Sequence, residues 1–579
     1  MVPHQSLNAA QTSAQTRATR SLKLLRHLEY FFRISNTTCA DQGLTVPDGF
    51  TAMYDQRWAG RAAAANNQYS GDYDVLNDCP TTMTPINWAN LEVGKLNVGQ
   101  KAAFDQIIAS VMTDPSDRSA QRIFFLEGDG GTGKTFVYNT LIKYCAAIKK
   151  KVTSMASTGI AATMVLNAGT VHSTFYIAND VTMTTESKMP AHSIRAKELA
   201  ATDLFILDEV SMLSQSVLSY VDKVLRDITN VNEPFGGKCL LLGGDWKQLP
   251  PVVKNASIPA IIHTSIRMSA TYESAQILRL TQNMRVGANQ LDFIQFLSDV
   301  GHGRNVLADD GNPSDFYQMP MANMETSVAD AIKFAYEPKW LKDPEQYAAE
   351  LCGSAILTPL ISSEVQINSM ILDKLTTPAR VYDAMDTIVH EGQSDAMVRQ
   401  FADKDLENLK NRPFPGVPEF HLKLKVGAIV LLMKNLNVKQ GLCNGTRLQV
   451  TALRDNIIVC KSMSGPFAAL DLEILIYRCL FEYKPEGKDA KSNVMFTRKQ
   501  FPLKLAFAMT INKSQGQTLN RVSVLFNDHN AFAHGMVYVA LSRVRTSDSF
   551  RIVNKADNQP GMVQNIVWLQ LLQIAFGGN

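Results

Sequence analysis

Short apolar runs alternate with stretches of helical periodicity from about residue 91 onward. The runs RIFFLE, KVTSMAS, DLFILDE and KCLLLGGD are each short and are each flanked by helical sequence. Runs of this kind are typical of strands that are buried on both faces of a parallel sheet. We therefore predict a parallel sheet covered by helices in the first half of the chain.

A second set of such runs begins with AILTPL at residue 355 and resumes with KLAFAMT, RVSVLF and FRIVN. The sequence between these runs, from about 415 to 500, has a different texture. It contains short alternating runs such as LKLKVGAIVLLMKN and turn signals such as CNGT. This pattern predicts a small β-domain inserted in a second parallel sheet.

Residues 1–90 lack this organisation. The segment RSLKLLRHLEYFFRI has helical periodicity, and the polar sequence after it is broken by Gly and Pro. The chain is therefore predicted to consist of a partly helical extension of unknown role over 1–90, a first lobe over 91–290 and a second lobe over 291–579.

Composition narrows the class of protein. No apolar run approaches the roughly 18 residues that a membrane-spanning helix needs, so no membrane association is expected. The net charge of +3 over 579 residues neither requires nor excludes a polyanionic partner. The eight cysteines have no metal-knuckle spacing, which is typical of reduced thiols in an intracellular protein. The expected compartment is the nucleus. The mitochondrion is the alternative, because basic residues precede the first acid as in a presequence, although we favour a basic arm or the remnant of a longer chain.

A glycine-rich loop follows the first predicted strand. The stretch GDGGTGKT fits the pattern G-x-x-x-x-G-K-[ST]. Its glycines allow backbone N–H groups to turn toward phosphate oxygens, and the helix that follows presents its N-terminus to the anion. Lys134 is expected to reach the β- and γ-phosphates, and Thr135 to bind Mg²⁺. The predicted phosphate-binding residues are Gly128, Asp129, Gly130, Gly131, Thr132, Gly133, Lys134 and Thr135.

Two acids end a later apolar run, DLFILDEVSML. Asp208 at the end of this predicted strand is expected to hold Mg²⁺. Glu209 next to it is a candidate general base for the attacking water. A pair of acids after a strand is common. This pair is a more specific signal, because it lies 74 residues after Lys134 and directly behind four apolar residues.

The stretch GGDWKQLPPV follows another predicted strand. A glutamine beside a terminal phosphate can orient water and report whether that phosphate is present, and Gln248 is the candidate. The two prolines after it stiffen the backbone. Together they predict a phosphate sensor joined to a rigid lever.

These motifs, in this order, resemble a known family. LNVGQ, the glycine-rich loop, ASTGIAA, GTVHSTF, DEVSM, GGDWKQLPPV, LTQNMR, INKSQGQTL and YVALSR occur in sequence between residues 96 and 543. The set resembles the PIF-type 5′-to-3′ DNA helicases of superfamily 1B, which are related to RecD, over roughly residues 91–555. The segments TINKSQGQTL and GLCNGTR are most similar to the helicase part of Helitron transposons. Asn512 is a departure, since many relatives have His there, and it leaves the DNA contact at that position open.

The resemblance implies two RecA-like lobes that hold ATP and Mg²⁺ between them. Arg285 and Arg543 are the candidates for positive charge on the γ-phosphate, and such arginines are worth roughly 10³–10⁵ in rate. Gln100 looks like the family's adenine-reading glutamine, while Gly516 and Gln515 would link the nucleotide to the DNA. The inserted segment at about 176–200 resembles the family's wedge, and the β-domain at 415–500 its second accessory domain.

The resemblance also implies a track for single-stranded DNA across both lobes, and activity on duplexes or forks. Small hydroxyls, amides and backbone groups suit phosphate contacts that ignore sequence, and an aromatic ring could stack on a base. For Phe175 a place in the core is about as good an interpretation. The candidate DNA-binding residues are Thr158, His172, Ser173, Phe175, Thr510, Asn512, Lys513, Ser514 and Gln515.

The expected function is ATP-dependent 5′-to-3′ DNA unwinding in repair, recombination or telomere maintenance, with the polarity implied by the family alone. Three alternatives stay open. The chain could be a nucleotide switch without motor activity, or an RNA helicase of the same superfamily. It could also be the helicase part of a Helitron-type protein or a domesticated relative. It has no His-x-His motif of the kind that the replication-initiator nuclease of such proteins carries.

Overall fold

The protein is described by a computed structural model in which the chain divides into two compact units, residues 1–74 and 75–579. The predicted N-terminal helix lies outside the described residues. The structure describes residues 75–114, 117–178, 181–190, 192–253, 256–284, 290–306, 314–388, 410, 414–437, 441–462, 473–483, 495–556 and 558–573.

A six-stranded sheet forms the first lobe, with strand order β3-β2-β4-β5-β1-β6 and every pair parallel. Its strands are β1 (Ile123–Gly128), β2 (Val152–Ala156), β3 (Gly169–Thr170), β4 (Leu204–Asp208), β5 (Cys239–Gly244) and β6 (Gln276–Leu280). The four runs that predicted buried strands are β1, β2, β4 and β5, so that prediction is confirmed.

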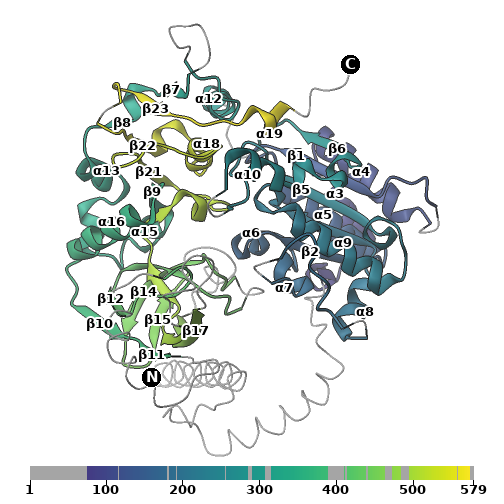
Figure 1. Cartoon of the computed structure of the whole chain (residues 1–579), viewed down its shortest axis with the longest axis horizontal. Coiled ribbons are helices and arrows are strands. Elements are labelled where there is room, and N and C mark those ends of the chain that lie inside the picture. The colour runs from purple at the N-terminus through teal and green to yellow at the C-terminus, as the bar shows by residue number, and fades with distance from the viewer. Residues whose placement is uncertain are drawn as a thin grey trace, which may run out of the picture. The chain divides into compact units, whose positions relative to one another are not determined.

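Helices surround this sheet in Figure 1. They are η1 (Val75–Asp78), α3 (Pro85–Val93), α4 (Val98–Met112), α5 (Lys134–Ala147), α6 (Gly159–Met164), α7 (Val171–Phe175), α8 (Ile194–Ala200), η2 (Val210–Met212), α9 (Gln215–Thr229), η3 (Pro234–Gly237), α10 (Ile258–Thr264), η4 (Ile266–Met268) and α11 (Ala270–Glu273). Side chains of this sheet belong to two separate apolar clusters, one containing Phe125 and the other Phe124. Neighbouring residues of a strand point to opposite faces, so both faces of this sheet are buried.

The second lobe is built on a five-stranded parallel sheet with order β20-β9-β21-β22-β8. Its strands are β8 (Met324–Glu325), β9 (Ser354–Thr358), β20 (Ala508–Thr510), β21 (Arg521–Leu525) and β22 (Phe550–Val553), and β7 (Phe316–Gln318) pairs separately with β23 (Met562–Gln564). Its helices are α12 (Leu291–Gly301), η6 (Met321–Asn323), α13 (Val328–Ala335), α14 (Pro338–Lys342), α15 (Ala348–Gly353), α16 (Ile361–Lys374), η10 (Ile511–Ser514), α18 (Met536–Leu541), η11 (Ser547–Ser549) and α19 (Leu569–Gln573).

Antiparallel strands interrupt this second sheet between β9 and β20. One sheet has the order β16-β15-β14-β13-β19, another β11-β18-β17, and β10 pairs with β12. The strands are β10 (Ala379–Asp383), β11 (Met385–Ile388), β12 (His421–Lys425), β13 (Ile429–Leu432), β14 (Arg447–Leu453), β15 (Ile458–Lys461), β16 (Glu473–Ile476), β17 (Cys479–Tyr483), β18 (Phe496–Gln500) and β19 (Leu503–Leu505). Strands β10 and β11 precede the predicted start near 415 and pair with strands of the insertion.

A single apolar cluster joins this insertion to one face of the second lobe. Ile356 of β9 and Ile371 of α16 lie in the same cluster as Leu448 of β14 and Ile474 of β16. Arg447 strengthens the junction, since its guanidinium donates to the carbonyl oxygens of Ser354 and Ala506. The antiparallel part is therefore packed onto the second lobe through a shared core.

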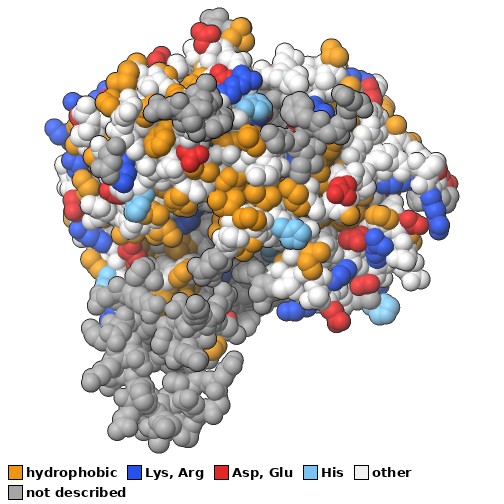
Figure 2. Space-filling model, turned by 45° about the horizontal axis from the view of Figure 1, so that its top comes forward, with side chains coloured by type: hydrophobic (Ala, Val, Ile, Leu, Met, Phe, Trp, Pro, Cys, Tyr) orange, Lys and Arg blue, Asp and Glu red, His pale blue; other side chains and the backbone are white. Residues whose placement is uncertain are grey.

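Among the described residues, no helix is long and apolar enough to cross a bilayer. The seven cysteines within the described ranges are free thiols, and four of them are buried. This agrees with the interpretation of reduced, structural cysteines. On the face drawn in Figure 2, basic and acidic side chains are interspersed, which fits the nearly balanced charge.

Candidate functional site

The glycine-rich loop joins the end of β1 to the start of α5. Gly131 has a φ of 96° and Gly133 a φ of 85°, a region of backbone conformation that favours glycine. Gly133 is the N-cap of α5, and no side chain caps that end. The first N–H groups of a 14-residue helix therefore face the interior of the loop, as a phosphate site requires.

The Lys134 ammonium lies inside this loop. It donates to the carbonyl oxygen of Gly128 at 2.5 Å. Its charge also lowers the pKa of two buried carboxyls, Asp208 and Asp245, against the stronger opposing effect of their burial. Lys134 thus contacts the loop backbone and acts electrostatically on the acids at the carboxyl ends of β4 and β5.

Asp208 and Glu209 lie at the end of β4. Burial, together with the negative charge of Glu209, raises the pKa of Asp208 to about 7. Glu209 has a φ of 54°, which is rare for a residue with a side chain, and its N–H donates to Asp208 Oδ1 at 2.9 Å. The Oε2 atom of Glu209 is buried and has no hydrogen-bond partner. A carboxylate held in an unusual backbone conformation with an unused oxygen is a good candidate for binding water or ligand.

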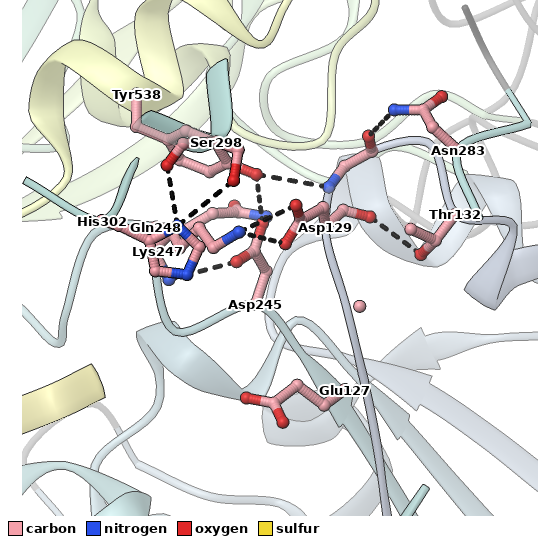
Figure 3. A network of polar contacts seen from close by, with 12 residues as sticks. Glu127, Asp129, Thr132, Asp245, Lys247, Gln248, Asn283, Ser298, His302 and Tyr538 are labelled. Carbon is pink, nitrogen blue, oxygen red and sulfur yellow. Dashed lines mark hydrogen bonds and ion pairs between the residues drawn. The ribbon is translucent and has the colours of Figure 1, made fainter. Parts of the chain in front are cut away.

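The segment Asp245–Gln248 connects the phosphate loop to the second lobe, and Figure 3 shows its contacts with Asp129 and Tyr538. The Tyr538 hydroxyl, from α18, donates to Asp245 Oδ2 at 2.8 Å and accepts from the Gly130 N–H at 3.4 Å. The Lys247 ammonium contacts both carboxylate oxygens of Asp129, at 2.7 and 2.8 Å. The phosphate loop is therefore bonded both to its own lobe and to the other one.

Gln248 reaches the second lobe directly. Its side-chain oxygen accepts from Gln515 Nε2 at 3.3 Å, and both side chains are buried. The next residue, Leu249, packs in the apolar cluster of the second lobe that includes Leu357 and Val539. The chain thus enters the apolar core of the second lobe at the residue directly after Gln248.

The turn before α18 also contacts the segment Asp245–Gln248. His534 Nε2 donates to the Trp246 carbonyl oxygen at 2.8 Å, and its Nδ1 accepts from the Trp568 N–H at 2.8 Å. Gly535 has a φ of 71°, and a Cβ there would lie 2.2 Å from the Lys247 carbonyl oxygen. Only glycine fits this close approach, because both the space and the backbone conformation exclude a side chain.

Burial lowers the pKa of His534 to about 4, so the folded protein keeps this imidazole neutral. The unfolded chain binds a proton near pH 6.5, and folding stability is therefore lost as the pH falls from 6.5 toward 4. The expected loss from this residue is about 2 kcal/mol between pH 7 and pH 5. Thermal unfolding at the two pH values measures it. His534→Gln should reduce the difference in unfolding free energy between pH 7 and pH 5. His263→Gln, a change at an exposed residue, should leave that difference as it is.

Arg543 lies on the second-lobe side of this junction. It is 3% exposed and donates to the Val539 and Gln517 carbonyl oxygens and to the Ser542 hydroxyl. Burial lowers the pKa of its guanidinium, and the charge of Glu209 partly opposes that effect. The structure therefore places Arg543 within electrostatic reach of Glu209 while its donors are bonded inside its own lobe. Arg285, the other candidate, lies outside the described residues.

Gln100 supports the phosphate loop. Its side-chain oxygen accepts from the Asn97 N–H, and its Nε2 donates to the Thr132 carbonyl oxygen at 3.0 Å. Asn97 in turn accepts from the Gln100 N–H, which makes a capping box at the start of α4. Both polar groups of Gln100 are thus committed to the protein, and an adenine would have to compete for them.

In the first lobe, the predicted DNA-binding residues follow strands β2 and β3. Thr158 caps α6 through its hydroxyl, His172 is half-buried, and Ser173 is exposed. Phe175 is a correction. It is 0% exposed and packs against Phe205 in the core, so it offers no ring for a base.

Tyr176, which sequence reasoning missed, is 50% exposed. Helix α7 ends at Tyr176, whose backbone is left-handed with a φ of 55°. This conformation turns the Tyr176 ring away from the core. An aromatic pair at a helix end is the only local signal that could have pointed to it.

In the second lobe, the predicted residues lie in β20 and η10. Ser514 is buried and donates to the Ile511 carbonyl oxygen, and Thr510 is nearly buried. Lys513 is exposed as a residue, but partial burial of its ammonium and the charge of the neighbouring Lys504 lower its pKa to about 8. Gly516 faces the first lobe, where a Cβ would be 3.6 Å from Ile160. The structure thus brings the segment 510–516 against the first lobe, with Lys513 as its accessible cation.

Three family models match consecutive parts of the chain. They are described as PIF1-like helicase, over residues 95–311, DNA helicase Pif1, 2B domain, over 408–453, and Helicase, over 481–559. Over residues 95–311 the chain is similar to the PIF1-like helicases. The match to the Pif1 2B domain falls on the antiparallel insertion of the second lobe.

Relatives in this family cover most of the chain. The chain is 28% identical over 462 residues to "ATP-dependent DNA helicase PIF1" of Danio rerio, covering 77% of this chain and 60% of the relative. It is 28% identical over 454 residues to "ATP-dependent DNA helicase Pif1" of Campylobacter jejuni, covering 74% and 88%. The chain thus spans less than two thirds of the Danio rerio relative.

The fold is shared with solved Pif1 structures. Bacteroides Pif1 in complex with ADP-AlF3 and single-stranded DNA superimposes with a TM-score of 0.57 at 24% identity, covering 82% of this chain and 96% of that one. The two parallel sheets, with an antiparallel insertion in the second, are therefore the two RecA-like lobes that the sequence predicted.

Proposed function

We propose that this protein is an ATP-dependent DNA helicase that moves along single-stranded DNA in the 5′-to-3′ direction and unwinds duplexes or forks. The observation that carries the proposal is the contact between Gln248 and Gln515. It joins the candidate phosphate sensor of the first lobe to the segment of the second lobe that holds the DNA-binding candidates. A change at the nucleotide therefore has a direct structural route to the nucleic acid.

The proposed nucleotide site fits ATP with Mg²⁺. The uncapped start of α5 and the left-handed glycines form a cradle for phosphate. Thr135 and Asp208 would hold the metal. Glu209 follows Asp208 in the sequence, its N–H donates to the Asp208 carboxylate, and its Oε2 is buried without a hydrogen-bond partner. When bound, Mg²⁺ neutralises charge that develops on the phosphate oxygens. The ADP-AlF3 named for the Bacteroides relative is consistent with this site.

The chain's own groups would divide the work of hydrolysis. Lys134 binds the phosphates, and Glu209 accepts the proton of the attacking water through its free oxygen. Gln248 orients that water. Arg543 donates to the transferred phosphoryl group once it exchanges its bonds to Val539, Gln517 and Ser542 for the substrate. Closure of the lobes would complete the site, and release of phosphate would loosen it.

The DNA would cross both lobes at the carboxyl ends of their strands. Lys513 and Asn512 in η10 would contact backbone phosphates from one lobe, and Thr158, His172 and Ser173 from the other. Tyr176 takes the place of Phe175 as the ring available for stacking on a base. Each base-pair step opened costs about 1.4 kcal/mol of stacking, which one ATP per step can supply. The 5′-to-3′ direction rests on the family resemblance.

ATP turnover and unwinding of tailed duplexes test the proposal. We expect single-stranded DNA to stimulate ATP hydrolysis, and ATP with Mg²⁺ to drive unwinding of a duplex with a 5′ tail but not of one with a 3′ tail. Turnover without DNA stimulation would instead support a nucleotide switch, and preference for matched RNA duplexes an RNA helicase. A role in repair, recombination or telomere maintenance, and a nuclear or mitochondrial location, are proposed from the family. A Helitron-type origin stays a prediction.

A further inference from the structure

The phosphate loop is held from outside by two side chains that no motif assigned a role. Asp129 and Gly130 are neighbours in the loop, and each has one partner of this kind. The Lys247 ammonium contacts Asp129, and the Tyr538 hydroxyl accepts from the Gly130 N–H (Figure 3). The two partners come from different lobes, Lys247 from the segment after β5 and Tyr538 from α18.

Tyr538 and Lys247 are also linked to each other through Asp245. Tyr538 donates to Asp245, two residues before Lys247, and the Lys247 N–H donates to Asp245 Oδ1 at 3.1 Å. Asp245 is 2% exposed, so its carboxylate has little water and depends on these donors. The loop, the Asp245 segment and α18 therefore form one hydrogen-bonded unit.

Helix α12 of the second lobe closes this unit on a further side. A Cβ at Gly301, its last residue, would lie 2.7 Å from Lys247 Cδ and 3.0 Å from Tyr538 Cδ2. Lys247 itself is only 11% exposed. Both side chains therefore pack closely against the end of this helix, where a glycine leaves them room.

We propose that Lys247 and Tyr538 are positioning residues that couple the geometry of the phosphate loop to the arrangement of the two lobes. The proposal rests on the proposed function and deepens it. A movement of α18 shifts the hydroxyl that binds Gly130, and a movement of the Asp245 segment shifts the ammonium that binds Asp129. The loop therefore senses the second lobe through contacts additional to the one between Gln248 and Gln515, and Gln248 joins the same unit by donating to Asp245 Oδ2 at 3.5 Å.

Tyr538→Phe is the first test, because it removes one hydroxyl and keeps the ring. A hydrogen bond to a charged group is worth about tenfold or more in an equilibrium. We expect the stimulation of ATP turnover by single-stranded DNA to fall about tenfold. The KM for ATP should change less than that stimulation does. Tyr336→Phe is the matched control, since its buried hydroxyl lies within hydrogen-bond distance of the Ser354 and Phe507 carbonyl oxygens, both in the second lobe.

A charge exchange is the second test, and it remains informative if Tyr538→Phe lowers stability. Lys247→Asp alone should place two carboxylates together and reduce DNA-stimulated turnover. The double variant Lys247→Asp with Asp129→Lys should recover at least half of the loss on a logarithmic scale, because the pair is restored in reverse. Lys150 and Asp203, an ion pair 3.2 Å apart elsewhere in the first lobe, give the control. Lys150→Asp alone and Asp203→Lys alone should each change the stimulation of ATP turnover by DNA only slightly.

The outcomes separate the two proposals. If the unaltered protein shows no stimulation by DNA, the proposed function fails. If it is stimulated, and both Tyr538→Phe and Lys247→Asp match their controls, the positioning role is overturned while the helicase proposal stands. A KM effect without an effect on stimulation, or no rescue in the double variant, would also overturn it.

Discussion

Arg543→Ala is expected to lower ATP turnover by about 10³–10⁵-fold and to leave nucleotide binding nearly unchanged. Arginines that complete a phosphoryl-transfer site from the facing lobe act on the charge of the transition state, so their loss appears in kcat. The structure places this guanidinium within electrostatic reach of Glu209 and otherwise surrounds it with its own lobe. Fluorescent-nucleotide binding and steady-state ATPase assays with saturating single-stranded DNA give the two quantities.

The controls for this variant address its burial. Removal of Arg543 leaves the Val539 and Gln517 carbonyl oxygens without a donor, so the melting temperature must be measured alongside turnover. Arg551→Ala, on β22 in the same lobe, removes an arginine that contacts Glu325 and should retain turnover. Arg543→Lys should remain impaired, since one ammonium cannot reproduce the planar fork of donors. Turnover by Arg543→Ala at a tenth of the normal rate or more would eliminate the catalytic role.

Lys134→Ala is expected to reduce turnover at least about 10²–10³-fold, the usual consequence of removing one preorganised cation from a site of developing charge. The ammonium lies within the loop at the Gly128 carbonyl oxygen, and its charge acts on Asp208 and Asp245. Unlike Arg543→Ala, this variant should also bind nucleotide more weakly. ATPase rates and nucleotide titrations therefore give different signatures for the two variants.

Lys143→Ala is the matched control, because it removes a lysine from the same helix. Lys143 contacts Glu92 at 3.2 Å and lies over the Trp88 ring, away from the loop. It should retain turnover within a few-fold, as expected for a partly exposed ion pair. Equal effects of the two lysine variants would mean that the loss reflects the stability of α5 and not the binding of phosphate.

The sequence predicted those parts of the fold that short-range patterns encode. Strands β1, β4 and β5 are continuous apolar runs buried on both faces, and such runs have few alternatives in a globular protein. The phosphate loop was predictable for a similar reason, since Gly131 and Gly133 adopt the left-handed conformations that the motif requires. The boundaries of the β-insertion were less accessible, because β10 and β11 find their partners across more than 35 residues.

The parts that could not be predicted depend on long-range contacts. Phe175 and Tyr176 are adjacent aromatic residues, and only the left-handed end of α7 decides which ring is buried. Tyr538 lies 408 residues from Gly130, and His534 lies 288 residues from Trp246. No periodicity or motif records such pairs. The sequence therefore identifies the nucleotide-facing residues of each lobe but not the side chains that connect the lobes.

The apolar cluster that unites the antiparallel insertion with the second lobe limits how this protein could be engineered. Leu448 and Ile474 on one side and Ile356 and Ile371 on the other are excluded from water by each other. An excised insertion would expose that surface and would be expected to aggregate, and a second lobe from which it had been deleted would lose half of one core. Grafting the insertion of another relative would succeed only if the facing residues of β9 and α16 were transferred with it.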